Sequence, residues 1–97
     1  MTIEEFIDSL AAEVPPAHVS RGLAALWHDG RGDWQRAHEV AQDIDDATGS
    51  WIHAYLHRKE SDEGNAHYWY RRAKVAPASG SLDEEWRAIV EALLTAS

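Results

Sequence analysis

Apolar residues recur every three or four positions in six separate stretches of the chain, which is the spacing of one face of an α-helix. Helix-starting polar residues, prolines and glycines separate these stretches. None of the six stretches alternates apolar and polar residues as a strand would. The pattern predicts helices over residues 2–14, 16–29, 34–47, 51–60, 61–75 and 82–95. We therefore expect an all-α fold of six short helices, arranged as stacked antiparallel hairpins because the connections are short.

Several local signals mark the ends of these helices. Thr2 with Glu5, and Ser81 with Glu84, have the spacing of a capping box, in which a hydroxyl and a carboxylate satisfy two backbone N–H groups at a helix start. After the third predicted helix, Gly49 is expected to adopt the left-handed conformation that closes a helix.

The five tryptophans should supply much of the core, since each buries a large apolar area. Four of them lie on apolar stripes and are expected to be mostly buried: Trp27, Trp34, Trp69 and Trp86. Trp51 lies at a predicted helix start, where the pattern does not fix its environment. The acidic residues within 43–46 and 83–85 are expected to be solvated.

Length and composition limit the possible functions. A chain of 97 residues fits one small domain, expected to span residues 1–97, and it has no cysteine for disulfides or thiolate metal sites. No apolar run approaches the roughly 20 residues that span a bilayer, and the N-terminus lacks a signal-peptide pattern, so a cytoplasmic location is expected. The net charge of −8 argues against nucleic acid or an anionic membrane as a partner.

The sequence contains an internal repeat. A shift of about 29 residues, which places Asp33 on Asp62, aligns the second and third predicted helices with the fourth and fifth. Other aligned pairs keep their character: Leu26 with Tyr55, Trp27 with Leu56, His28 with His57, Ala37 with Ala66, and His38 with His67. The repeat predicts two similar helical hairpins, in which a small alanine lets the paired helices approach closely.

Two stretches resemble known helical repeats. Gly32-Asp33-Trp34-Gln35-Arg36-Ala37 resembles the turn and second-helix start of a tetratricopeptide-type repeat, and Trp69-Tyr70-Arg71-Arg72-Ala73 resembles the second helix of Sel1-like repeats. These resemblances cover roughly residues 23–75 and imply a helical-repeat fold, with the first and last helices as caps. The whole chain also resembles small uncharacterised bacterial proteins that share its His-Arg-Lys-Glu and Tyr-Trp-Tyr-Arg-Arg stretches, which implies no activity.

Six histidines raise metal binding and acid–base chemistry as possible activities, because imidazole ligates metals and titrates near neutral pH. His53, His57 and Glu60 fall on one side of the fourth predicted helix, and His67 lies on the next helix. The two histidines have chelating spacing, but Ala54 stands where a metalloprotease helix carries its general base. We expect these histidines to flank the core, and we assign no catalytic residue, cofactor or metal.

Aromatic and basic residues meet on the fifth predicted helix. Each residue turns by about 100°, so Tyr68 points away from the apolar stripe and should be exposed. The expected partner-binding residues are Tyr68, Arg71, Arg72 and Lys74, with Arg58 and Lys59 from the preceding helix. Aromatic and arginine side chains are the usual anchors of protein interfaces.

The sequence thus favours a small non-enzymatic protein–protein interaction module. Its partner would be a protein, a peptide or a second copy of the chain. The alternative is a small metal- or histidine-dependent enzyme that uses His53, His57, Glu60 and His67.

Overall fold

A computed structural model of the chain describes residues 1–95. Over that range the elements are α1 (Ile3–Asp8), a 3-10 turn η1 (Ser9–Ala11), α2 (Arg21–Gly30), α3 (Trp34–Gln42), α4 (Ala47–Lys59), α5 (Glu63–Ala73) and α6 (Leu82–Thr95). These residues contain no strand, so the predicted all-α class is confirmed.

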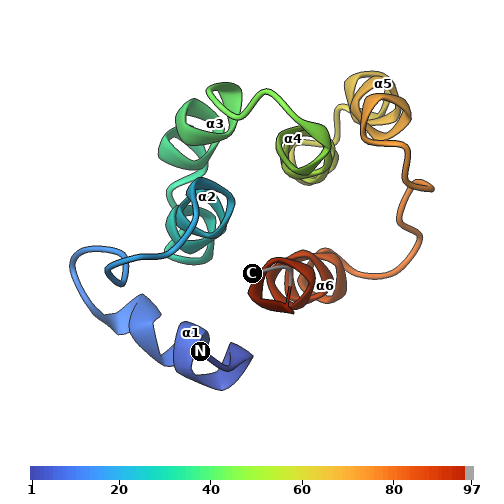
Figure 1. The fold of residues 1–97 in the computed structure, drawn as a ribbon. Helices are drawn as coiled ribbons and strands as arrows, with labels where there is room; N and C mark the ends of the chain where they lie inside the picture. The colour runs from blue at the N-terminus through green and yellow to red at the C-terminus, as the bar shows by residue number, and fades with distance from the viewer. Residues whose placement is uncertain (96–97) are drawn as a thin grey trace.

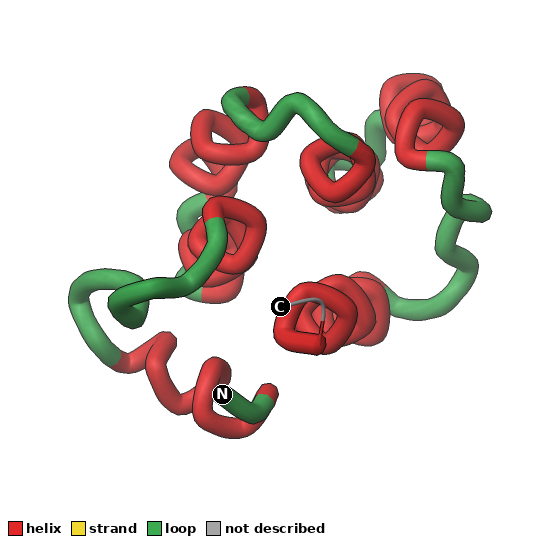
Figure 2. The backbone as a smooth tube through the Cα atoms, viewed as in Figure 1, coloured by secondary structure: helices red, strands yellow, loops and turns green. Residues whose placement is uncertain are grey.

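The helices α2 to α5 follow one another in an arc, with α3 and α5 on its outer side and α6 on its inner side (Figure 1). Helix α2 packs against α3, α4 packs against α5, and α6 contacts α1, α2 and α4. The irregular segment 74–81 carries the chain from α5 back to α6 (Figure 2). Within residues 1–95, none of the helices has the length and hydropathy of a transmembrane segment.

The main core lies where α1, α2, α4 and α6 meet. Its largest fully buried side chains come from all four helices: Phe6, Leu26, Trp27, Ile52, Leu56, Ile89 and Val90. A smaller cluster between α4 and α5 contains Ala54, Ala66 and Tyr70. Two of its three buried members are alanines, which is how these two helices come close together.

The two hairpin turns are built alike. The N–H of Asp33 donates to the carbonyl of His28 at 2.9 Å, and the N–H of Asp62 donates to the carbonyl of His57 at 2.9 Å. Each aspartate then caps the following helix, with φ and ψ of −102° and 75° for the first and −98° and 74° for the second. The internal repeat in the sequence is therefore also a repeat of turn geometry.

Both predicted capping boxes are present. Thr2 and Glu5 exchange hydrogen bonds of 2.8 and 3.1 Å, and Ser81 and Glu84 exchange two of 3.0 Å. Bonding to the backbone N–H lowers the pKa of both carboxyl groups. These boxes set the starts of α1 and α6.

The connection between the first two helices is longer than predicted. The helical segment ends at Ala11 rather than at residue 14, since Ala12 already has extended backbone angles, with φ of −79° and ψ of 170°. Val14, which continues the helical spacing of Ile3, Ile7 and Leu10, is 69% exposed. Helix α2 begins at Arg21 rather than at residue 16. The preceding Ser20 caps it, because its hydroxyl accepts a hydrogen bond from the N–H of Leu23.

Gly49 is not a left-handed cap, and that prediction is wrong. Helix α3 ends at Gln42, and α4 already begins at Ala47, where Asp46 caps it by accepting from the N–H of Gly49 at 3.0 Å. A Cβ on Gly49 would collide with the backbone carbonyl of Ile44. The glycine thus permits a close approach between α4 and the chain that leads into it.

The tryptophans divide by layer. Trp27 and Trp86 are buried as predicted, whereas Trp34 and Trp69 are only partly buried, as is Trp51. Trp34 and Trp69 belong to the outer helices α3 and α5, which have fewer neighbours to cover them than the inner helices have.

Glu85, which was expected to be solvated, is instead 5% exposed. Its carboxylate accepts hydrogen bonds from the Tyr70 hydroxyl at 2.6 Å, the Trp51 indole at 3.3 Å and the Arg58 guanidinium at 2.9 Å. We call these four residues the Glu85 network. It ties α6 to α4 and α5. Burial and the Glu85 carboxylate raise the pKa of Tyr70.

Asp29 on α2 is a second buried carboxylate. It accepts from the Tyr55 hydroxyl at 2.6 Å and pairs with the Lys59 ammonium at 2.8 Å. Burial and this carboxylate raise the pKa of Tyr55. The two carboxylates therefore link α4 to both of its inner neighbours, α2 and α6.

Candidate functional site

Three imidazoles converge between α3 and α4. His38 comes from α3, while His53 and His57 lie one turn apart on α4. One ring nitrogen from each lies within 4.8 Å of the other two. The ring centroids are 4.8 Å apart for His38 and His53, 5.6 Å for His38 and His57, and 5.8 Å for His53 and His57. We call these residues the histidine triad.

Two tryptophans flank the triad. Trp34 stacks on His38 with 4.9 Å between ring centroids, and Trp69 from α5 stacks on His53 at 4.2 Å. The Trp34 indole also donates to the carbonyl of Leu56 at 2.9 Å, which fixes its ring. The half-buried tryptophans of the outer helices thus hold two of the three imidazoles in place.

Burial favours the neutral form of two of the three histidines, His38 and His53. His53 is only 6% exposed, and burial lowers its pKa to about 4, with a further lowering from His38 and His57. Burial and His57 also lower the pKa of His38, while the nearby Glu60 carboxylate acts in the opposite direction. His38 and His53 are therefore neutral at pH 7 and can offer a lone pair.

Polar side chains contact the two more accessible triad members. The Gln42 side-chain amide lies 2.9 Å from Nδ1 of His38. The Asp62 carboxylate lies 3.8 Å from Nδ1 of His57. Both contacts are on Nδ1, which leaves the Nε2 atom of each ring for other partners.

Of the four residues that the sequence suggested for this face, the triad contains His53 and His57. Glu60 is exposed at the end of α4 and His67 is exposed on α5, so neither belongs to the triad. The third member is His38, which sequence reasoning did not place there. The available signal was its position directly after Ala37, a residue of the buried stripe, which places His38 beside the covered side of α3.

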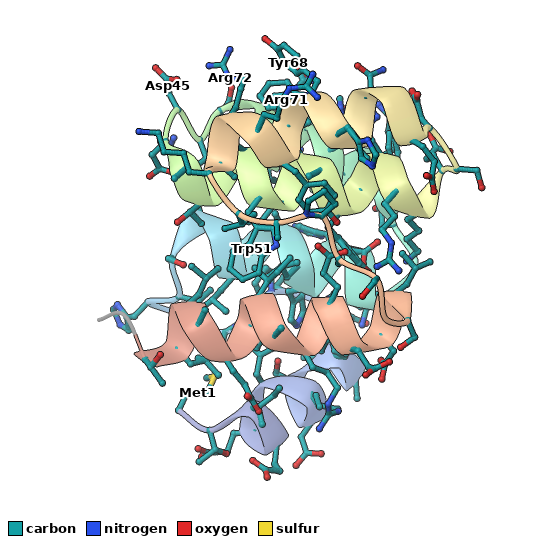
Figure 3. The ribbon with its side chains drawn as sticks, turned by 90° about the vertical axis from the view of Figure 1, so that its right-hand side faces the viewer. Met1, Asp45, Trp51, Tyr68, Arg71 and Arg72 are labelled. Carbon is teal, nitrogen blue, oxygen red and sulfur yellow. The ribbon has the colours of Figure 1, made fainter. Side chains whose placement is uncertain are left out.

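The aromatic and basic residues of the fifth helix form a separate surface. Tyr68, Arg71, Arg72 and Lys74 are all exposed, and we call them the α5 outer face. Tyr68 is 44% exposed, so it lies in solvent as the sequence predicted. Figure 3 shows Tyr68, Arg71 and Arg72 projecting outward from α5, far from Met1 at the opposite end of the molecule.

Arg72 is held in place on this surface. Its Nη1 donates to the Tyr68 hydroxyl at 3.1 Å. Its guanidinium carbon lies 5.8 Å from the centre of the Tyr68 ring and 5.2 Å from that of Trp69. The Tyr68 and Trp69 rings meet edge to face at 5.2 Å. A cation close to two aromatic rings is attracted by both.

Arg58 and Lys59 have intramolecular partners. Arg58 pairs with Glu85 and also donates to the carbonyl of Gly80, and Lys59 pairs with Asp29. These contacts turn both cations toward buried carboxylates of the inner helices. We therefore leave them out of the α5 outer face.

A cleft of about 340 Å³ lies between α1, η1, α2, α4 and α6. Apolar side chains from Ile7, Leu10, Leu82 and Trp86 contribute to its walls. Asp29, Tyr55 and Lys59 also line it, but the Tyr55 hydroxyl and the Lys59 ammonium both donate to the Asp29 carboxylate. The candidate functional residues are therefore those of the histidine triad and the α5 outer face.

Comparison of the chain with protein-family models, with curated proteins and with solved structures found no match. The side chains themselves are the basis on which a function can be assigned.

Proposed function

We propose that the protein is a small non-enzymatic interaction module that binds an acidic segment of another protein through the α5 outer face. The observation that carries the proposal is the arrangement of Arg72, an exposed cation held against Tyr68 and Trp69. A side chain that is already ordered loses less conformational entropy when it binds. Arginine beside tyrosine and tryptophan is also the composition of an interface hot spot.

Charge selects the partner. Arg71, Arg72 and Lys74 place three cations near one end of α5, on a protein whose net charge is −8. A basic surface on an acidic protein favours a partner segment that is itself acidic, because opposite potentials steer the encounter. The resemblance to tetratricopeptide and Sel1-like repeats supports a protein partner, and a cytoplasmic location is part of the proposal.

The test uses a short fluorescent peptide that alternates glutamate and leucine, measured by fluorescence anisotropy in the presence of a chelator. The peptide should bind, and its affinity should fall as salt is raised. Tyr68→Ala and Arg72→Ala should each weaken binding by about tenfold or more, the loss typical of a hot spot. The free energy of unfolding of Tyr68→Ala should stay within about 1 kcal/mol of the parent value, because the ring is exposed.

Arg36→Ala is the matched control. Arg36 is an exposed arginine on the other outer helix, and it pairs with Glu39 at 3.5 Å. It should retain parental affinity for the peptide. The proposal fails if the acidic peptide does not bind, if a peptide with lysine in place of glutamate binds equally well, or if Arg36→Ala weakens binding as much as Arg72→Ala.

A further inference from the structure

We propose that His38, His53 and His57 form a binding site for a divalent transition metal of the zinc class. The proposal goes beyond the interaction module, since it concerns a different set of side chains between α3 and α4. It also differs from the metal face considered from the sequence, because His38 replaces Glu60 and His67 as the partner of the α4 pair.

The donor set determines the class of metal. Three imidazole nitrogens suit zinc, copper and nickel, whereas calcium and magnesium require oxygen ligands. The chain has no cysteine to recruit softer thiolate chemistry. Zinc has no geometric preference from its d-electrons and commonly takes three protein ligands, with water or an external donor in the fourth position.

Small side-chain rotations would complete the geometry. Zinc bound at 2.0–2.1 Å by tetrahedral ligands needs nitrogens about 3.3 Å apart, whereas the triad nitrogens lie within 4.8 Å of one another. His53 is buried and stacked on Trp69, so it serves as the fixed ligand. His38 and His57 are partly exposed and can turn toward it.

The surroundings provide the outer contacts that metal-binding histidines usually have. A ligating imidazole donates its other N–H to a carboxylate or a carbonyl oxygen, which fixes the tautomer. The Asp62 carboxylate faces Nδ1 of His57, and rotation of the Gln42 amide would present its oxygen to Nδ1 of His38. Both contacts leave Nε2 for the metal. The nearby Glu60 carboxylate adds favourable negative charge.

The test is a calorimetric titration of the full chain with zinc chloride, together with visible spectroscopy of the cobalt-loaded protein. One zinc should bind per chain, and cobalt should give the intense visible bands of a tetrahedral site. His38→Gln and His57→Gln should lose more affinity than the 10- to 100-fold that follows loss of an outer contact. Asp62→Asn retains a good N-cap residue and should lose about tenfold.

His67→Gln is the matched control, since His67 is exposed on α5 outside the triad. It should bind zinc like the parent, and Arg72→Ala should do the same, which separates this test from that of the peptide surface. The cobalt spectrum of the parent protein needs no substitution to be informative. The proposal is overturned if zinc does not bind stoichiometrically, if cobalt remains octahedral, or if His38→Gln retains parental affinity.

Discussion

The Glu85 carboxylate is the acceptor for three donors from two other helices, so replacing it with glutamine measures how much this buried network stabilises the fold. The substitution keeps the size of the side chain but removes the charge that neutralises Arg58, whose side chain is only 18% exposed. Removing one partner of a buried ion pair costs about 3–5 kcal/mol, because the other charge stays desolvated. The new amide keeps only one acceptor oxygen, so its NH2 group faces either the Arg58 guanidinium, which donates to Oε1, or Tyr70 and Trp51, which donate to Oε2.

The loss should be a large part of the total stability. A domain of this length is stable by about 5–15 kcal/mol. Urea unfolding at pH 7, followed by tryptophan fluorescence and circular dichroism, should show Glu85→Gln destabilised by about 3–5 kcal/mol. Tyr70→Phe removes only one hydrogen bond to a charged group and should cost about 1.5–3 kcal/mol. Glu91→Gln, at an exposed position of the same helix, should stay within about 0.5 kcal/mol.

The double variant Arg58→Met with Glu85→Leu provides a further check. Replacing both charges with apolar side chains removes the uncompensated charge, so the double variant should recover the part of the Glu85→Gln loss that comes from the desolvated Arg58, while the Tyr70 hydroxyl still lacks its acceptor. A loss below about 1 kcal/mol in Glu85→Gln would refute the reasoning, since it would mean that water reaches Arg58 and takes the place of the carboxylate.

Two further predictions concern other features of the fold. Gly49→Ala should destabilise the fold by about 1–3 kcal/mol because its Cβ meets the Ile44 carbonyl. Gly64→Ala in α5, whose Cβ meets nothing within 4 Å, should stabilise it by about 0.5–1 kcal/mol. Urea unfolding measures both changes, and the same sign for the two would contradict the packing at Gly49. The folded pKa of His53 lies below the unfolded value near 6.5, so the neutral His53 stabilises the fold fully above pH 6.5 and this contribution should fall by about 2 kcal/mol toward pH 4, a value that allows for screening by solvent. Urea unfolding of chelator-treated protein should show that His53→Leu flattens this pH dependence. An unchanged slope would contradict the prediction.

The existence of the helices could be predicted because apolar periodicity records which side of each helix is covered. Their ends were harder, since they depend on backbone details. The first helical segment ends where Ala12 takes extended backbone angles, and Asp46 caps α4, so this helix begins at Ala47 rather than at residue 51. The repeat could be found because each hairpin turn uses an aspartate at the equivalent place, Asp33 and Asp62.

The buried carboxylates show a limit of reasoning by residue type. Glu85 was grouped with its acidic neighbours, yet it lies three residues after Leu82 and four before Ile89, on the covered face of α6. Its helical position predicted burial, although its charged side chain led to a prediction of solvent exposure. His38 was missed for another reason: whether α3 brings it against His53 depends on how two helices pack, which periodicity within one helix does not determine.

The hydrogen bond from the Trp86 indole to the carbonyl of Leu26 joins residues 60 positions apart. Contacts between α2 and α3 and between α4 and α5 close short loops, whereas packing α6 against α2 closes a long one. The entropy cost of closing a long loop slows the formation of the α6 contacts. The two hairpins should therefore form first and α6 should dock late in folding. During synthesis, the apolar inner side of α2 and α4 would stay uncovered until α6 has left the ribosome. Substitutions that weaken only the docking of α6, such as Ile89→Val, should speed unfolding more than they slow folding.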